Sequence, residues 1–172
     1  MRKILLGVGI SLDGYIARPD GDVDFLFTPE DFSMAEFFAS VDVNLMGRKT
    51  LDAALRLGAK FDAPAANYVF SRTQAAGARD GVTFVNQEPA TLVERLRREP
   101  GKHIWLMGGG ELAREFLAAD LVDEIHLGIV PVLLGAGIPL FPAGFPQREF
   151  TLVENKTYSQ GLIALQYARQ RG

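Results

Sequence analysis

The 172-residue sequence has no cysteine and only two histidines. Without cysteine, the chain can form neither a disulfide scaffold nor a thiolate metal site, and it has no cysteine nucleophile. Two histidines are too few for a histidine-rich metal centre. We therefore predict no metal site, and the lack of disulfides fits a cytoplasmic location.

The sequence also lacks a surplus of either charge, because 18 basic and 21 acidic side chains give a formal charge of −3. This balance predicts no nucleic-acid partner. Residues 125–145 contain no Asp, Glu, Lys or Arg and are long enough to span a bilayer. Three prolines and four glycines in that stretch favour a strand and a turn-rich loop instead, so we expect no membrane segment. With no internal repeat or linker, residues 1–172 form a single predicted domain.

Short apolar runs alternate with helical patterns along the chain. Thr28 followed by Pro29, and Thr91 followed by Glu94, are helix start signals. The predicted helices cover 28–40, 50–57, 91–99 and 111–119, and the predicted strands cover 3–10, 41–46, 67–70, 82–85, 103–107 and 124–130. Residues 150–157 and 162–168 predict a terminal antiparallel hairpin. Together they indicate an α/β fold with about eight strands, most of them parallel and flanked by helices.

Glycines and basic residues follow three of these predicted strands, in the runs Gly47-Arg48-Lys49-Thr50, Ser71-Arg72 and Gly108-Gly109-Gly110. Open α/β sheets bind ligands at the carboxyl ends of their strands, and helix N-termini there attract phosphates. The joint placement predicts a dinucleotide with an extra 2′-phosphate, which Ser71 and Arg72 would hold. Alternatively, the glycines serve only turns and packing, and the basic side chains are solvated surface charges.

Five motifs recur in this order in a known superfamily: Ser11-Leu12-Asp13-Gly14-Tyr15-Ile16-Ala17, Met46-Gly47-Arg48-Lys49-Thr50, Ser71-Arg72, Gly108-Gly109-Gly110-Glu111-Leu112 and Pro131-Val132-Leu133-Leu134-Gly135-Ala136-Gly137-Ile138-Pro139-Leu140-Phe141. The chain thereby resembles the dihydrofolate-reductase-like superfamily. Within it, the chain is similar to stand-alone relatives of the C-terminal reductase domain of the bifunctional riboflavin-biosynthesis deaminase/reductase. This resemblance implies a three-layer fold and NADPH as hydride donor.

The resemblance also implies where NADPH would bind. One end of the pyrophosphate region would be held by Gly47, Arg48, Lys49 and Thr50. Backbone N–H groups would hold the other end, within the run Gly108, Gly109, Gly110, Glu111 and Leu112. Ser71 and Arg72 would contact the adenosine 2′-phosphate, and backbone near Gly9 and Ile16 would meet the nicotinamide carboxamide.

Two carboxylates are candidates for the catalytic acid. Folate reductases use a carboxylate early in the helix after the first loop, and Asp31 has such a position here. Asp31 also lies in the first turn of the predicted helix, so capping alone would explain it. Asp13 follows the first strand and could face the ligand or form a turn before Gly14.

The predicted function is NADPH-dependent hydride transfer to a small heterocyclic substrate, similar to 5-amino-6-(5-phosphoribosylamino)uracil reductase. A dihydrofolate or pterin reductase and a non-catalytic NADPH sensor are the alternatives. His126 could approach the ligand or be a satisfied sheet histidine, and Trp105 is interpreted as core. The loop 131–145 and the terminal hairpin offer surface for a homodimer.

Overall fold

The computed structural model describes residues 1–61 and 64–171. In chain order its strands and helices are β1 (Ile4–Ile10), β2 (Tyr15–Ala17), α1 (Ala35–Ser40), β3 (Val41–Gly47), α2 (Arg48–Arg56), β4 (Ala66–Phe70), β5 (Gly77–Arg79), β6 (Val82–Val85), α3 (Pro89–Arg98), β7 (His103–Gly108), α4 (Gly110–Ala118), β8 (Glu124–Ile129), β9 (Ile138–Pro139), β10 (Phe150–Thr157) and β11 (Ile163–Arg169). A short 3₁₀ turn, Ser159–Gly161, joins the last two strands.

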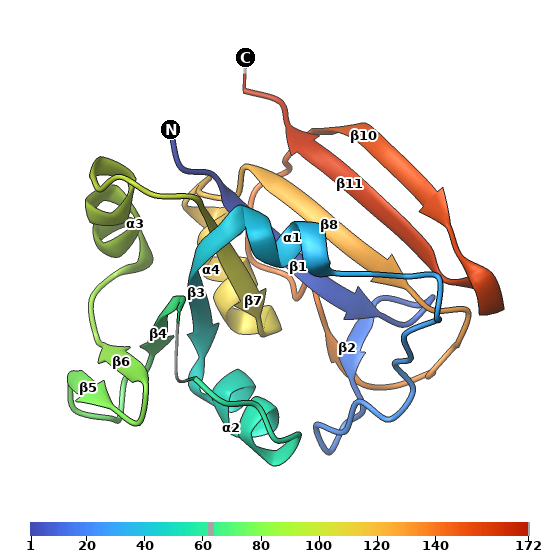
Figure 1. Cartoon of the computed structure of the whole chain (residues 1–172), viewed down its shortest axis with the longest axis horizontal. Coiled ribbons are helices and arrows are strands. Elements are labelled where there is room, and N and C mark those ends of the chain that lie inside the picture. Colours follow the sequence, from blue (N-terminus) through green and yellow to red (C-terminus); the bar gives the residue numbers. More distant parts are fainter. Residues whose placement is uncertain (62–63, 172) are drawn as a thin grey trace.

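Within the described residues, nine strands form one mixed sheet in the order β10-β11-β8-β1-β7-β3-β4-β6-β5 (Figure 1). The strands from β8 to β6 in this order run parallel, and β10, β11 and β5 pair antiparallel. The parallel strands therefore all end at one edge of the sheet, which we call the carboxyl edge. β2 and β9 pair antiparallel and form a small second sheet. This sheet joins the loop after β1 to the loop after β8.

The main hydrophobic core lies on one face of the sheet. Side chains such as Ile4, Leu6 and Leu106 point to this face and are fully buried against α3 and α4, where Phe116 and Leu92 meet them. Figure 1 shows α1 and α4 on opposite sides of the sheet. Each fully buried side chain of this size contributes roughly 1.5–3 kcal/mol. This core holds the central strands and the starts of their following helices in place.

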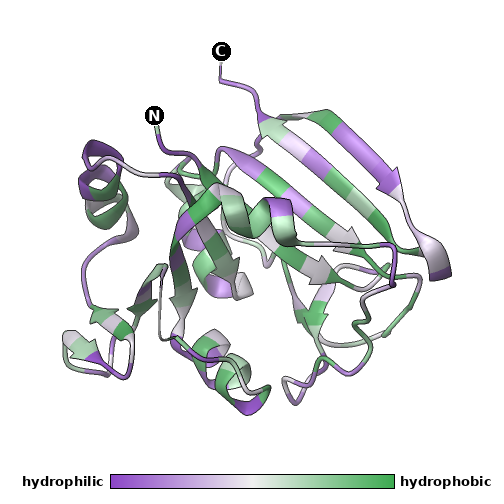
Figure 2. Ribbon diagram, in the orientation of Figure 1, coloured by the Kyte–Doolittle hydropathy of each residue, from purple (hydrophilic) through white to green (hydrophobic). Residues whose placement is uncertain are grey.

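The opposite face, which we call the open face, is covered less completely. α2 packs on β3 and β4 through Leu51 against Met46 and Val69. Segment 25–40 crosses β1 and β7, where the ring of Phe37 lies 5.4 Å from the ring of Trp105. Hydrophilic and hydrophobic residues alternate along β8 in Figure 2, which is the pattern of a strand with one buried face.

The structure confirms the predicted α/β fold and places each predicted strand within one residue of its expected bounds. It adds β5 and the small β2–β9 sheet, which the sequence did not predict. The stretch 125–145 contains most of β8 and then an irregular loop, as expected, and the short strand β9 lies within that loop. None of the helices in the described part of the chain combines the length and the apolar character that a membrane crossing needs.

The predicted helix over 28–40 was wrong in its first half. α1 begins only at Ala35, and residues 28–34 form a loop with a turn at residues 30 and 31. The side chain of Asp31 accepts hydrogen bonds from Ser159 instead of capping a helix, and Phe32 packs on Tyr158 with ring centroids 5.0 Å apart. Phe38 of α1 is half exposed. Contacts with the terminal hairpin have overridden the local helix signal.

Two other helix starts also differ from the prediction. α3 begins at Pro89 rather than at the Thr91 capping box, because proline is well suited to the first helical position. α2 begins at Arg48, directly after its strand, and ends before Gly58, whose φ of +84° favours glycine. α2 and α4 therefore both begin immediately at the carboxyl edge.

Candidate functional site

The N-termini of α2 and α4 lie beside each other at the carboxyl edge. Their preceding strands, β3 and β7, are neighbours, with Met46 in register with Gly108. Gly47 and Gly109 are the two N-cap residues, and no side chain caps either helix. The first N–H groups of a helix lack intrahelical acceptors and carry a partial positive charge. Two such starts side by side suit a ligand with linked phosphates.

Three of the predicted cofactor residues converge at this point. A Cβ placed on Gly109 would lie 3.5 Å from Thr50 Oγ1 and 3.6 Å from Ile16 Cδ1. A Cβ on Gly47 would meet no atom within 4 Å. Gly109 thus leaves a space free of side-chain atoms. The start of α2, the start of α4 and the strand β2 face one another across it.

The glycines of the Gly108–Gly110 run have different structural roles. Gly108 has a φ of +99°, which favours glycine, and the bond between Gly108 and Gly109 is cis. A Cβ on Gly110 would collide with the carbonyl oxygen of Pro139. Gly110 is thus required for packing, the alternative that the sequence left open, and its backbone N–H remains at the helix start.

Glu111 and Leu112 are the other two predicted cofactor residues at the start of α4, and they can bind a ligand only through their backbone. The side chain of Leu112 is buried in the main core. Glu111 is exposed and pairs with Arg114 at 2.7 Å. Any anion bound here would meet their N–H groups and not their side chains.

Ser71 and Arg72 follow β4 at the same edge. Ser71 is buried, and its hydroxyl oxygen accepts hydrogen bonds from the backbone N–H groups of Gln74 and Thr73 at 3.0 and 3.3 Å. Arg72 is 89% exposed and donates to Glu115 Oε1 of α4 at 2.8 Å. Such exposed pairs contribute little to stability. The pair keeps the Arg72 guanidinium beside α4, where an incoming phosphate can replace the carboxylate.

Arg48 and Lys49 open α2 on its exposed side. Arg48 approaches Asp52 at 3.6 Å, a loose contact between neighbouring turns of the helix. Both cations therefore lie at the carboxyl edge, at the start of α2.

Asp13 ties two loops together. Its carboxylate accepts hydrogen bonds from the Ser11 hydroxyl at 2.7 Å and from the backbone N–H groups of Gly135 and Leu134 at 2.8 and 3.2 Å. The Ser11 hydroxyl, helped by these backbone groups, lowers the pKa of Asp13. The loop after β1 is thereby fastened to the loop after β8.

Asp31 has a similar role in a different place. It accepts hydrogen bonds from the Ser159 hydroxyl at 2.6 Å and from the Ser159 backbone N–H at 2.9 Å. The Ser159 hydroxyl is the main cause that lowers the pKa of Asp31. A general acid must be protonated at the working pH. The hydrogen bonds of Asp13 and Asp31 favour the ionised form of both, and this geometry favours structural roles for them.

A polar cluster on the open face was not recognised as a unit in the sequence. Glu124 is buried and accepts hydrogen bonds from Lys3 Nζ at 2.6 Å, His126 Nε2 at 2.9 Å and Gln166 Nε2 at 3.0 Å. The bond from His126, followed by that from Lys3, outweighs burial and lowers the pKa of Glu124 to about 2. The signal in the sequence was the spacing of Glu124 and His126, two residues apart on one strand face. Gln166 comes from a distant strand that only the sheet order brings near.

Trp105 lies on the same face and is half-buried. Its indole N–H donates to the carbonyl oxygen of Gly7 at 2.9 Å. Phe37 and Phe38 pack on it at centroid distances of 5.4 and 5.6 Å. Trp105 therefore anchors segment 25–40 to the sheet and is not a free stacking platform.

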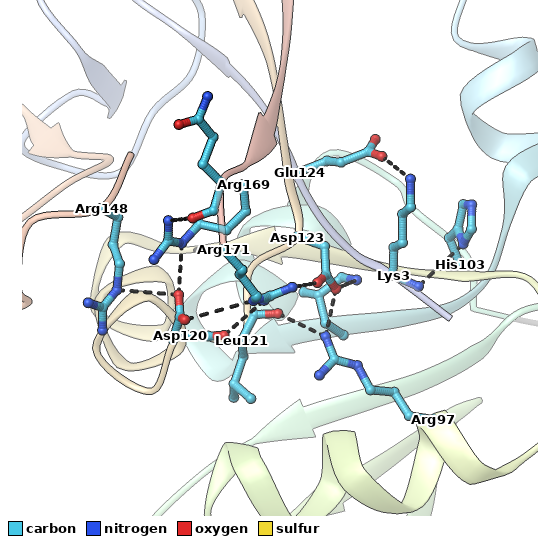
Figure 3. Close-up of polar contacts among 12 residues, drawn as sticks. Lys3, Arg97, His103, Asp120, Leu121, Asp123, Glu124, Arg148, Arg169 and Arg171 are labelled. Atoms are coloured by element: carbon cyan, nitrogen blue, oxygen red, sulfur yellow. Dashed lines mark hydrogen bonds and ion pairs between the residues drawn. The ribbon is translucent and has the colours of Figure 1, made fainter. Parts of the chain in front are cut away.

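The opposite, amino-terminal edge of the sheet carries the largest group of ion pairs (Figure 3). Asp120 meets Arg169 at 2.9 Å and Arg148 at 3.4 Å, and Asp123 meets Arg97 at 2.6 Å. Arg148 also donates to the last carbonyl groups of α4. An open depression borders this group, but its arginines are occupied in fastening α4 and β11. In the part of the chain that the structure describes, no three His, Asp or Glu side chains gather in a way that could hold a metal ion.

Comparisons with known proteins identify the family and the fold. A family model described as the RibD C-terminal domain matches residues 2–164. The uncharacterized protein YwjB of Bacillus subtilis (strain 168) is 35% identical over 172 residues, covering 98% of both chains. A solved structure from Shewanella sp. PV-4, provisionally assigned as a riboflavin biosynthesis protein, is 28% identical with a TM-score of 0.86 and covers 99% of this chain and 100% of that chain.

A more distant match shows the fold alone. It is the diaminohydroxyphosphoribosylaminopyrimidine deaminase/5-amino-6-(5-phosphoribosylamino)uracil reductase of Thermotoga maritima, with a TM-score of 0.76 and 16% identity. The match covers 98% of this chain but 57% of that protein. The fold of this chain is thus that of the reductase structures of this family.

Proposed function

The chain belongs to the RibD C-terminal domain family, a family of reductase domains, and on this basis we propose that it is an NADPH-dependent reductase of the riboflavin-biosynthesis type. Its substrate would be a small heterocycle. The absence of a membrane-crossing helix in the described residues and the lack of cysteine are compatible with a cytoplasmic enzyme.

The observation that supports the proposal most is the convergence of Gly109, Thr50 and Ile16 between two uncapped helix starts. The N–H groups of residues 48–50 would bind one side of a pyrophosphate, and those of residues 110–112 the other. Arg72, held beside α4 by Glu115, would bind the 2′-phosphate. Backbone near Gly9 and Ile16 would meet the nicotinamide carboxamide. When bound, NADPH supplies the hydride, and the chain supplies orientation and binding.

A non-catalytic NADPH-binding role is the competing proposal. It is favoured by one observation, namely that Asp13 and Asp31 are both engaged in loop contacts that keep them ionised. A reductase then needs its proton from water, from the substrate or from another group on the open face.

The decisive experiment is calorimetric titration of the protein with NADPH and, in parallel, with NADH. We expect NADPH to bind at least tenfold more tightly, because hydrogen bonds to a charged phosphate contribute roughly 1.5–3 kcal/mol. Oxidation of bound NADPH is then followed at 340 nm with dihydrofolate, dihydropterin and the ribosylaminopyrimidine. Binding of neither dinucleotide would contradict both roles, and tight binding without turnover of any compound would favour the sensor.

A further inference from the structure

The loop after β1 is folded back on itself by Ser11, which is fully buried. The backbone N–H of Ser11 donates to the carbonyl oxygen of Tyr15 at 2.9 Å, and its hydroxyl oxygen accepts a hydrogen bond from the Tyr15 N–H at 3.0 Å. Gly14 closes this turn with a φ of +85°, a conformation that favours glycine. Because Tyr15 is the first residue of β2, Ser11 determines where β2 begins.

Asp13 orients the Ser11 hydroxyl and joins it to a second loop. The hydroxyl donates its one hydrogen to Asp13 Oδ1 at 2.7 Å, so its oxygen is left to accept the bond from Tyr15. The carboxylate of Asp13 also accepts hydrogen bonds from the backbone N–H groups of Gly135 and Leu134, which belong to the loop after β8. Hydrogen bonds to an ionised group are about twice as strong as neutral ones. Asp13 therefore connects the start of β2 firmly to the loop after β8.

The loop after β8 packs in turn on β2 and on the start of α4. Its strand β9 pairs with β2. A Cβ on Gly137 would collide with the carbonyl oxygen of Ala17, and a Cβ on Gly110 would collide with the carbonyl oxygen of Pro139. The two loops and the first turn of α4 thus lie backbone against backbone. A shift of either loop would therefore move β2 relative to α4.

Ile16 is the middle residue of β2 and lies where these elements meet. A Cβ on Gly109, the N-cap of α4, would lie 3.6 Å from Ile16 Cδ1. The expected contact of Ile16 with the nicotinamide carboxamide is a backbone contact, so it depends on where β2 is held. β2 has three residues and β9 has two, and among the described residues β2 pairs with β9 alone. An isolated pair of strands is only marginally stable. The position of Ile16 therefore depends on the hydrogen bonds of Asp13.

We propose that Asp13 is a positioning residue for the nicotinamide end of the cofactor. It acts through Ser11 and through the loop after β8, and it holds β2 where the backbone of Ile16 meets the carboxamide. Asp13 itself neither touches the cofactor nor transfers a proton. The proposal rests on the function proposed above, because it takes NADPH as the ligand. The phosphate contacts come from α2, α4 and Arg72, so they do not depend on Asp13.

The test compares NADPH with 2′-phospho-ADP-ribose, which has the same phosphates and adenosine but no nicotinamide. Each is titrated into the protein by calorimetry, and we expect the wild type to bind NADPH at least tenfold more tightly. Asp13→Ala should lower the affinity for NADPH about tenfold and leave the affinity for 2′-phospho-ADP-ribose unchanged, because only the nicotinamide contact is lost. Asp13→Asn keeps one acceptor oxygen and should limit the loss to about threefold. Ser11→Ala should repeat the effect of Asp13→Ala.

The controls separate this inference from the function on which it rests. Asp31→Ala is the matched variant, since Asp31 also accepts from a serine hydroxyl and a backbone N–H group and joins two segments, and it should change neither affinity. Binding of 2′-phospho-ADP-ribose shows that a variant is folded, and Asp13→Asn decides the test if Asp13→Ala does not fold. If the wild type binds neither ligand, the proposed function is wrong. If it binds both equally, or if the variants of Asp13 retain NADPH or lose both ligands to the same extent, the inference about Asp13 is wrong.

Discussion

The acidic side chains of this protein differ in the groups that donate hydrogen bonds to them. Asp13 and Asp31 are bound by serine hydroxyls and backbone N–H groups and join loops. Glu124 is bound by three side chains from three separate strands or strand ends and lies buried on the open face. The basic side chain of Arg72 differs from these three carboxylates, because it pairs with Glu115 and still remains exposed to water. The three carboxylates are thus structural, because the fold already supplies their hydrogen-bond donors. The exposed guanidinium of Arg72 is free to bind a ligand.

Arg72→Ala should lower the affinity for NADPH about tenfold and leave the affinity for NADH unchanged. The reason is that a guanidinium makes charge-assisted bonds to a 2′-phosphate that NADH lacks. Calorimetry with both dinucleotides measures the effect. Arg95→Ala is the matched control, since Arg95 is also an exposed arginine paired with a glutamate. Equal losses for NADPH and NADH would contradict the assignment of the 2′-phosphate.

Glu124 should make the free energy of unfolding depend on pH between 4.5 and about 2. Its pKa in the folded chain is about 2, against an ordinary value of 4.5. A lowered pKa stabilises the fold fully above the unfolded value, and this stabilisation disappears as the pH falls from 4.5 toward 2. At neutral pH it amounts to about 3 kcal/mol.

Glu124→Gln should therefore reduce the free energy of unfolding at pH 7, and the gap to the wild type should narrow between pH 4.5 and pH 3. Urea unfolding at pH 7, 5, 4 and 3 measures both. Glu99→Gln, at an exposed helix end, serves as the control. A gap that stays constant over this range would show that the charge of Glu124 does not stabilise the fold.

At the scale of elements, segment 25–40 is the part whose position depends most on a few contacts. α1 has six residues and buries none of them. The segment is held by the bonds of Asp31 to Ser159, by Phe25 among Val130 and Leu162, and by Phe37 on Trp105. It covers part of the open face, where Leu26 lies against Gly9 and Phe37 against Trp105, so its attachment to the hairpin turn affects access to that face.

Asp31→Ala and Ser159→Ala should have the same effect, and the double variant should add little to either. Each should lower the melting temperature by roughly 2–4 °C and speed amide hydrogen exchange in residues 25–34. Binding of NADPH should not change. Thermal melts and hydrogen exchange of the three variants provide the measurement. Additive losses in the double variant would mean that Asp31 and Ser159 act separately, which would reopen a catalytic role for Asp31.

The strands, and the presence of a helix after β3 and after β7, could be predicted from the sequence because local patterns determine them, although α2 begins two residues earlier than expected. Apolar runs bounded by glycine mark the strands, and Gly47 and Gly109 mark the helix starts. The first half of the helix over 28–40 could not be predicted, because Ser159, its competing partner, lies far along the chain. The link of Glu124 to Gln166 depends on β11 pairing with β8, and a single sequence carries no signal of that pairing.

At the scale of the whole molecule, β10 is an unprotected edge. Residues 151–157 are all exposed, including the adjacent apolar pair Leu152 and Val153. Such edges tend to pair with another strand. Two copies of β10 paired antiparallel about Asn155 would place Glu154 of each copy opposite Lys156 of the other. A symmetric dimer through this strand would thus bring opposite charges together and cover the apolar pair.

We propose that the protein is a homodimer at micromolar concentration, formed through β10. Size-exclusion chromatography with light scattering should give twice the mass of one chain. Val153→Lys should yield monomers, because it places two additional positive charges at the paired edge. Leu57→Lys, at an exposed leucine of another element, should leave the dimer intact. A wild-type monomer at these concentrations would contradict the proposal.

The position of β1 in the sheet has a consequence for how the chain is made. Ile4 lies beside Ile104 and Leu5 beside Glu124, so both neighbours of the first strand are 100 or more positions further along the chain. Contacts this distant in sequence slow folding, because the intervening loop must close first. At roughly 5–20 residues per second, the ribosome needs several seconds to reach β8. β1 therefore remains unpaired until β7 and β8 have emerged, and during that time it exposes an apolar segment that the cell must keep from aggregating.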